Sequence, residues 1–415
     1  MAGKIEPLAN DYITVYESDT EKQEYVYTPG ICVLPGGRII ATLDHKYPDI
    51  PQQEKGMVFL SDNGTHFRFS AYFPFVHARP FIAGDKLYII GVAQQIGIVR
   101  SDDRGETWSE PAFITPPEGE GCGWHSTAAN VWYTEDRVYL AMEHRVAPDC
   151  VSWPVAAMAP VLLRANIHDD LLKRESWTFA SEVFFRDAVD QEKLDDFGVP
   201  FFEVPRGGVI DTSPIKKRTC APIGWLETNV TRVMDEKHYW FDPQGRTYHL
   251  LARAHTGGTG YACLAKVVEQ EDGSMQTCFE HVPSGRRQVF LPMPGGQMRF
   301  HILYDPQTRL YWLLSTQATD SMTRSELLPD DRYNLPNNER RRLTLHFSRN
   351  LVDWCFAGLV AVGEMEKASR HYASMAIDGE DLLVLSRSGD WRARSAHDGN
   401  LITLHRVKNF RTLVY

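Results

Sequence analysis

The sequence lacks several features that would assign its class at once. Its seven cysteines stand singly with no C-x-x-C pair, so neither a disulfide framework nor a cysteine zinc site is indicated. No apolar run is long enough to span a bilayer, and the start, MAGKIEPLANDYITVY, has no apolar signal-peptide core. We therefore expect a cytoplasmic protein, or a periplasmic or secreted one if the chain is a processed form. A formal net charge of −10 argues against nucleic acid or an anionic membrane as the main partner.

What the sequence does contain is a repeated window. Six times, turn residues are followed by a run rich in β-branched, aromatic and leucine residues that ends in polar residues. The six windows are GGRIIATLDHK (36–46), GDKLYIIGVAQ (84–94), EDRVYLAMEHR (135–145), QGRTYHLLARA (244–254), QTRLYWLLSTQ (307–317) and GEDLLVLSRSG (379–389). Another apolar segment precedes each window, so each repeat predicts a β-hairpin. A further strand, a polar turn and an aromatic residue follow most hairpins, which gives four strands per repeat.

Six four-stranded units predict an all-β fold, a six-bladed β-propeller, which closes on itself and so removes exposed sheet edges. Two β-sandwiches are the alternative. We expect one domain over residues 1–415, in which YITVYES (12–18) is a spare strand that completes the last blade. Two aperiodic stretches, 186–225 and 319–341, are expected to be insertions, and ERRRL (339–343) a solvated run of charges. The blade hairpins are expected near residues 27–69, 77–113, 125–180, 227–283, 298–361 and 370–415.

One polar turn carries a recognisable motif. Residues 99–108, VRSDDRGETW, place Ser101, Asp103, Gly105, Thr107 and Trp108 in an S-x-D-x-G-x-T-W pattern, with weaker copies in SDNGTHF and SRNLVDW. The pattern resembles the Asp box, or BNR repeat, of sialidase-like β-propellers. In that family the box is a structural turn between outer strands, so the resemblance implies the fold and not the site. Its aspartate can bond the turn backbone, and its tryptophan can pack on the blade.

The repeat also indicates where a site would lie. The first strand of each propeller blade starts, and the second ends, at the same face of the molecule. Polar residues recur at these ends, and arginine is prominent among them although the chain is acidic. Because arginine suits two-point recognition of a carboxylate, we expect an acidic oligosaccharide or glycoconjugate as the partner. Strand ends are also commonly solvated, so a structural role is the alternative for each residue. The expected substrate-binding residues are Arg79, Arg145, Arg253, Arg299, His301, Arg370, His371 and Arg387.

The sialidase resemblance implies catalytic roles as well. Sialidases use a tyrosine nucleophile at the start of the last blade, and RHYASMAIDGEDLLVLSR (370–387) is similar to that segment, which implies Tyr372. The segment WLETNVTRVMDEKHYWFDPQGRTYHLLAR (225–253) is similar to the one that carries the helper glutamate and an arginine, which implies Glu227 and Arg253. Sialidases also place an arginine before a proline in the first blade, and YVYTPGICVLP (25–35) lacks it.

The remaining assignments stay open at the level of sequence. Asp44, Asp49 and His125 are candidates for the acid that protonates the leaving group. His77, His125, His301 and His371 come from four blades and would suit a metal only if they converge. No ligand-spacing motif supports that, so no cofactor is expected.

Three functions fit these residues. The first is an exo-acting glycoside hydrolase acting on a sialic or uronic acid, and the second is a polysaccharide lyase cleaving next to a uronic acid. The third is a non-catalytic glycan-binding propeller. The sequence leaves the oligomeric state open.

Overall fold

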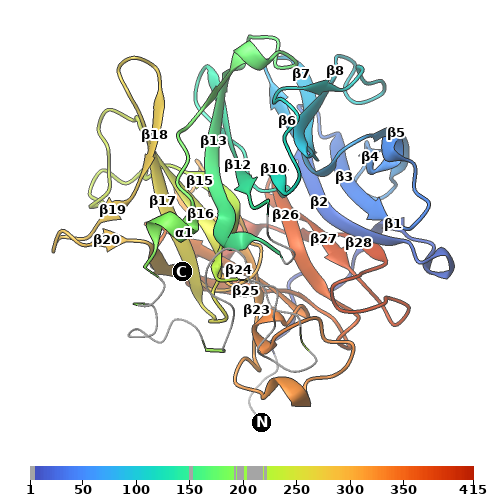
Figure 1. Cartoon of the computed structure of the whole chain (residues 1–415). Coiled ribbons are helices and arrows are strands. Elements are labelled where there is room, and N and C mark those ends of the chain that lie inside the picture. Colours follow the sequence, from blue (N-terminus) through green and yellow to red (C-terminus); the bar gives the residue numbers. More distant parts are fainter. Residues whose placement is uncertain (1–4, 149–152, 191–192, 194–200, 203–217, 219–221) are drawn as a thin grey trace.

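A computed structural model describes residues 5–148, 153–190, 193, 201–202, 218 and 222–415. Within these residues six antiparallel sheets are arranged around an axis as blades, which confirms the predicted six-bladed β-propeller (Figure 1). From the axis outward, blade one is β2 (Tyr25–Val33), β3 (Ile39–Lys46), β4 (Gly56–Ser61) and β5 (Arg68–Phe73). Blade two is β6 (Val76–Ala83), β7 (Lys86–Ala93), β8 (Gln95–Ser101) and β9 (Ala112–Phe113).

The third and fourth blades each carry one additional short strand. Blade three is β10 (Cys122–His125), β12 (Arg137–Val146), β13 (Met158–Asn166) and β14 (Trp177–Phe179), and β11 (Trp132–Tyr133) also pairs with β12. Blade four is β15 (Gly224–Thr231), β16 (Thr247–His255), β17 (Tyr261–Glu269) and β18 (Met275–Cys278), and β21 (Phe290–Pro292) also pairs with β17. A separate hairpin, β19 (Glu280–His281) with β20 (Arg287–Gln288), follows β18, and the α-helix α1 is Phe185–Ala188.

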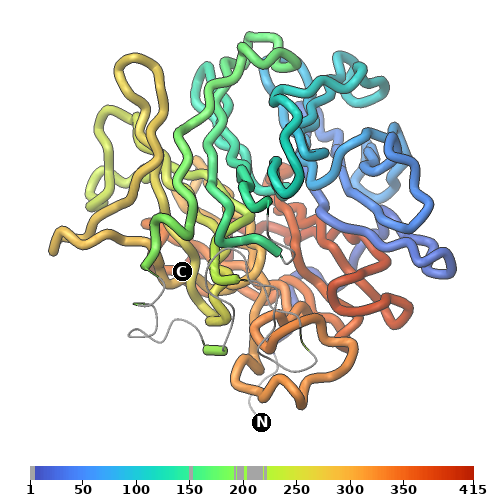
Figure 2. The backbone as a smooth tube through the Cα atoms, in the orientation of Figure 1, coloured from blue at the N-terminus to red at the C-terminus, as the bar shows by residue number. Residues whose placement is uncertain are grey.

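The two ends of the chain meet in the last blade. Blade five is β22 (His301–Asp305), β23 (Leu310–Gln317), β24 (Arg342–Ser348) and β25 (Cys355–Val362). Blade six is β26 (Arg370–Asp378), β27 (Asp381–Ser388), β28 (Leu401–Val407) and β1 (Ile13–Glu17). As predicted, the N-terminal strand is the outer strand of this blade, pairing from Ile13↔Leu404 to Glu17↔Leu401. Figure 2 shows this as a blue segment beside the red ones.

The hydrophobic core lies between neighbouring blades. One cluster joins Val26 and Leu43 of blade one to Leu385 and Leu404 of blade six. Another joins blades three, four and five. Each blade therefore buries both faces against its neighbours, which fits the near-continuous apolar runs of the repeated windows. None of the described helices is long and apolar enough to cross a membrane.

The turn at 99–108 also fastens one blade to the next. Asp103 Oδ1 accepts the Thr107 N–H at 2.9 Å, and Ser101 Oγ accepts the Gly105 N–H at 2.8 Å. Gly105 has φ +93°, and a Cβ there would lie 2.9 Å from a methyl group of Leu60. Trp108 Nε1 donates to Ser70 Oγ of β5 at 3.2 Å, so the tryptophan ties blade two to blade one. The turn joins outer strands and is structural in its contacts.

Candidate functional site

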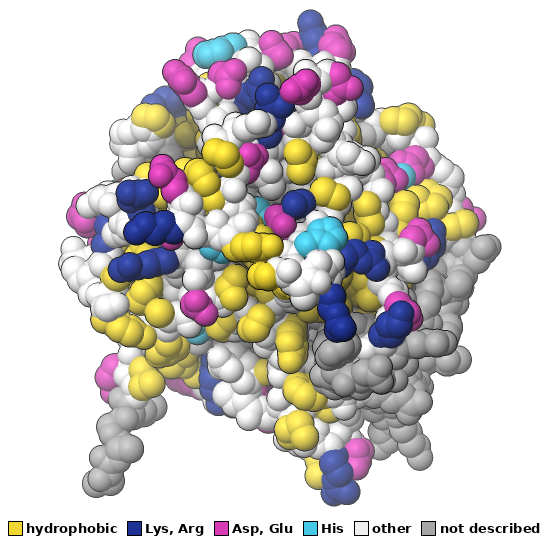
Figure 3. All heavy atoms as spheres, turned by 90° about the vertical axis from the view of Figure 1, so that its left-hand side faces the viewer, with side chains coloured by type: hydrophobic (Ala, Val, Ile, Leu, Met, Phe, Trp, Pro, Cys, Tyr) yellow, Lys and Arg dark blue, Asp and Glu magenta, His cyan; other side chains and the backbone are white. Residues whose placement is uncertain are grey.

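A cavity of about 1420 Å³ lies where the innermost strands begin and the second strands end. Six of the thirteen residues that the sequence suggested as catalytic or substrate-binding line it, and Asp49 is not among them. These are Asp44, His125, Glu227, Arg253, Tyr372 and Arg387. On the outer face seen in Figure 3, acidic and basic side chains are interspersed. In the cavity, by contrast, the three arginines Arg253, Arg340 and Arg387 lie around Tyr372.

Four of the innermost strands carry the same irregularity. In each, the pairing with the second strand shifts register within a few residues of the strand start. In each, one non-glycine residue adopts a left-handed backbone: Thr28 (φ +41°), His77 (φ +57°), Glu227 (φ +61°) and Tyr372 (φ +49°). All four side chains line the cavity. A bulge re-aims a side chain, and such strained residues cluster at functional sites. The repeated bulge therefore explains how four blades direct one side chain each toward the axis.

Tyr372 is held by Arg253. Arg253 Nη1 donates to the Tyr372 hydroxyl at 2.7 Å and lies 3.5 Å from Glu227 Oε2, so one guanidinium bridges the tyrosine and the glutamate. Burial raises the pKa of Tyr372 and Glu227 adds to this, whereas Arg253 opposes the rise. The hydroxyl is therefore protonated in the unliganded site.

Two further arginines flank the same ring. The guanidinium carbons of Arg340 and Arg387 lie 5.1 and 5.5 Å from the Tyr372 ring centroid. Arg340 Nη1 bonds His371 Nδ1 at 2.8 Å, and Arg387 Nη2 donates to the carbonyl of His397. Burial lowers the pKa of Arg340 to about 10. Among the described residues neither arginine pairs with a carboxylate, and the Nε atom of each is buried without a hydrogen-bond partner. Two buried cations that form no ion pair among the described residues favour an anionic ligand.

Asp44 sits at the end of β3 against the bulge of β6. Its Oδ1 accepts the His77 N–H at 3.2 Å, and His77 Nδ1 is 2.9 Å from Thr28 Oγ1. Burial raises the pKa of Asp44 to about 7, against the opposing effects of the His77 N–H, Arg387 and Thr28. Burial also lowers the pKa of His77 to about 3, so this imidazole is neutral. Asp44 can therefore hold or release a proton near neutral pH.

Two of the expected substrate-binding arginines bond the backbone instead of facing the cavity. Arg299 donates to the carbonyls of Tyr372 and Ala128 and to Ser374 Oγ. Arg79 donates to the carbonyls of Asn130 and Ala141 and to Ser126 Oγ. Both are almost fully buried and neither lines this cavity, so the expectation that they bind substrate is not supported by their placement.

The other four expected substrate-binding residues are also absent from the cavity lining. They are Arg370, His371, His301 and Arg145. Arg370 donates to the carbonyls of Ser369 and Gly389, and His371 is fully buried against Arg340. His301 lines a second cavity of about 770 Å³, formed by later residues of the innermost strands, and Arg145 is half-buried on β12. The four histidines considered for a metal therefore do not converge. The described residues contain no group of three or more potential ligands suited to a metal ion.

Sequence reasoning missed the contribution of the 319–341 insertion. This segment brings Tyr333, Asn334, Asn338 and Arg340 to the cavity. The expectation that 339–343 is a solvated charge run is wrong, because Glu339 and Arg340 are only 1% and 2% exposed. The insertion joins a second strand to a third strand, and such connections lie at the site face by the geometry of the blade. That rule would have found it, together with Trp153, His397 and Asp398.

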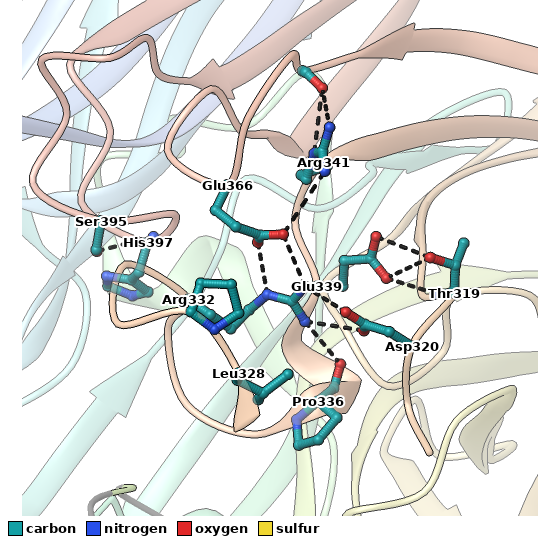
Figure 4. A network of polar contacts seen from close by, with 12 residues as sticks. Thr319, Asp320, Leu328, Arg332, Pro336, Glu339, Arg341, Glu366, Ser395 and His397 are labelled. Atoms are coloured by element: carbon teal, nitrogen blue, oxygen red, sulfur yellow. Dashed lines mark hydrogen bonds and ion pairs between the residues drawn. The ribbon is translucent and has the colours of Figure 1, made fainter. Parts of the chain in front are cut away.

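A buried arginine fastens this insertion to the propeller. Arg332 donates to both oxygens of Asp320, at 3.0 and 2.7 Å, and to both oxygens of Glu366, at 2.7 and 3.0 Å (Figure 4). Most of the other insertion, 186–225, lies outside the described residues and stays a prediction. Arg218 is described, lines the cavity and donates to the carbonyls of Arg332 and Leu328.

Comparisons with known proteins support the fold. No family model matches the chain, and no curated protein matches its sequence. Among solved structures, the Hadza microbial sialidase Hz136 is 15% identical with a TM-score of 0.54, covering 96% of this chain and 68% of that one. The alpha-L-arabinanase of Penicillium chrysogenum, complexed with arabinobiose, is 12% identical with a TM-score of 0.51, covering 98% and 100%. The alpha-L-arabinofuranosidase of Fusarium graminearum is 9% identical with a TM-score of 0.50, covering 96% and 98%. The chain therefore has a sialidase-like propeller fold.

Proposed function

We propose that the chain is an exo-acting glycoside hydrolase that removes an acidic sugar, with Tyr372 as the nucleophile. The observation that carries this proposal is the set of three arginines around Tyr372, two of which pair with no described carboxylate. The solved structures of the same fold are named a sialidase, an arabinanase and an arabinofuranosidase, which supports a glycosidase over other uses of a propeller.

In this proposal the three arginines around Tyr372 bind the substrate carboxylate together. Arg253 matches the arginine that sialidases carry in the fourth blade, while Arg340 and Arg387 occupy the role of the arginine missing from the first blade. A carboxylate bound by Arg253 would compete for the Nη1 atom that now holds the Tyr372 hydroxyl. Binding would thus free the tyrosine to approach Glu227, which lies on the same guanidinium.

The reaction then needs two proton transfers in each of its two halves. Tyr372 attacks the anomeric carbon and passes its proton to Glu227, which is required because burial raises the tyrosine pKa. Asp44, with a pKa of about 7, donates a proton to the departing oxygen as the glycosidic bond breaks. Water then attacks the anomeric carbon and loses a proton to Asp44, while the bond to the Tyr372 oxygen breaks and Glu227 returns its proton to that oxygen, which regenerates the enzyme.

Replacement of Tyr372 by phenylalanine tests the assignment. The panel would contain 4-methylumbelliferyl N-acetylneuraminide, 4-nitrophenyl β-D-glucuronide and the neutral 4-nitrophenyl β-D-glucoside. We expect turnover of an acidic member only, and loss of that turnover in Tyr372→Phe at an unchanged melting temperature. Retained turnover in the variant would refute the role of Tyr372, and preference for the glucoside would refute the acidic substrate.

A polysaccharide lyase is the second candidate, and one observation favours it. The Tyr372 hydroxyl is bonded to Arg253, and His125 lines the same cavity, so a carboxylate neutraliser and two candidate bases are present together. Elimination beside a uronic acid forms an unsaturated product with strong ultraviolet absorbance, which hydrolysis does not. Binding of an acidic glycan without either product would instead favour a non-catalytic propeller.

A further inference from the structure

His125 has no role in the proposed reaction. Its ring is hydrogen-bonded to a buried carboxylate, that of Glu143. Glu143, on β12, is 1% exposed. Its Oε2 lies 2.9 Å from His125 Nδ1, and its Oε1 accepts the Thr228 backbone N–H at 2.8 Å. Burial alone would raise the pKa of Glu143, but His125 and Thr228 outweigh burial and lower it. Both oxygens are therefore acceptors, each with its own donor.

This arrangement determines which nitrogen of His125 carries the proton. An ionised carboxylate accepts hydrogen bonds and cannot donate one, so Nδ1 must be the donor. In the neutral imidazole Nε2 is then an acceptor. His125 lines the cavity, with the His77 ring at 5.4 Å and the Trp153 ring at 5.1 Å beside it.

We propose that Glu143 is a positioning residue that fixes His125 in the Nδ1–H tautomer, so that Nε2 presents a hydrogen-bond acceptor to the cavity. A ligand must then place a donor there, and on a sugar that donor is a hydroxyl group or the N–H of an N-acetyl group. The substrate is then a sugar that has a carboxylate for Arg253, Arg340 and Arg387 and a hydroxyl or N-acetyl N–H donor for His125. Only this last statement rests on the proposed function.

The same carboxylate also braces the neighbouring blade. Thr228 directly follows Glu227, the residue with a left-handed backbone that projects into the cavity. Because Glu143 binds the Thr228 N–H, it holds the bulge of β15 as well as the ring of His125. One side chain of blade three thus aligns a residue from each of two blades.

Replacement of Glu143 by glutamine gives a sharp test, because a glutamine has only one acceptor oxygen. The Thr228 N–H can only donate, so the amide oxygen must face it and the NH₂ group must face His125. Nδ1 then has to accept, and the proton of the imidazole moves to Nε2. Ring-nitrogen NMR of ¹⁵N-histidine-labelled full chain, recorded at about pH 9 where an ordinary imidazole is neutral, reads the tautomer directly. The His125 signals are assigned by their loss in His125→Gln.

We expect Nδ1–H in the wild-type chain and Nε2–H in Glu143→Gln. Glu280→Gln is the matched control, because Glu280 Oε1 lies 2.8 Å from Nε2 of another buried histidine, His249. This pair lies outside the cavity. The control should leave the His125 signals unchanged. Nε2–H in the wild type would overturn the inference even if the variant fails to fold, and so would Nδ1–H in a folded Glu143→Gln. No substrate is used, so a chain that shows this switch but cleaves no acidic sugar would keep this inference and lose the proposed function.

Discussion

Asp44→Asn should stabilise the protein at alkaline pH while removing its activity. Asp44 is buried, and its carboxyl pKa rises to about 7 from an ordinary 3.8. Between these two pH values the folded chain holds a proton that the unfolded chain has lost. Stability therefore falls as pH rises through this window, because folding must take up the proton that the unfolded chain has released, and the loss is complete above pH 7, where both states are ionised.

The size of this effect follows from the pKa difference. Since each pKa unit is worth about 1.4 kcal/mol, the rise from 3.8 to about 7 corresponds to about 4 kcal/mol. Asparagine never ionises, and its oxygen can still accept the His77 N–H. The stability gain of Asp44→Asn over wild type should thus be small near pH 4 and approach 4 kcal/mol near pH 8.

Urea unfolding of both proteins at several pH values measures this difference, and other titrating groups cancel in the comparison. Turnover of the acidic chromogenic substrate, measured alongside, should fall about 100- to 10,000-fold as expected for loss of a general acid. A stability difference that does not change with pH would refute the raised pKa. Wild-type turnover in the variant would refute the role of Asp44 as the acid.

Two other substitutions probe the arginines. Arg340→Met removes one charged contact to the substrate, so calorimetry should show an acidic sugar binding about 10- to 100-fold more weakly; equal weakening for a neutral sugar would contradict this. Arg332→Met leaves Asp320 and Glu366 without their buried partner, which should cost about 3–5 kcal/mol locally. Hydrogen exchange should then accelerate over 319–341 but not over β1, and unchanged exchange in the insertion would show that Arg332 does not fasten it.

The fold was readable from the sequence because the repeat is strong. A hairpin turn followed by a buried strand recurs in every blade, and closure by the N-terminal strand follows from a strand left without a partner. The sialidase resemblance implied Tyr372 and Glu227, and the structure brings both side chains to the cavity. The bulges that aim them were not predictable, since a left-handed backbone at a non-glycine residue depends on the packing around it.

The predictions that the structure does not support also have physical causes. Arg79 follows His77 by two residues, which strict alternation would place on the same side, but the bulge between them breaks that alternation. Its guanidinium therefore donates to backbone carbonyls and does not line the cavity. Arg340 lies in a non-repeating insertion, where no strand period can show that it is buried. The hydrogen bonds of Arg332 to Asp320 and Glu366 likewise join residues that are far apart in the sequence.

The most direct test of the central claim is a crystal structure of the chain soaked separately with D-glucuronate, N-acetylneuraminate and D-glucose. The account expects one of the two acids to bind with its carboxylate within hydrogen-bond distance of at least two of the guanidinium groups of Arg253, Arg340 and Arg387. The anomeric carbon should face Tyr372. A carboxylate bound away from these arginines, or glucose occupying the cavity in place of both acids, would contradict it.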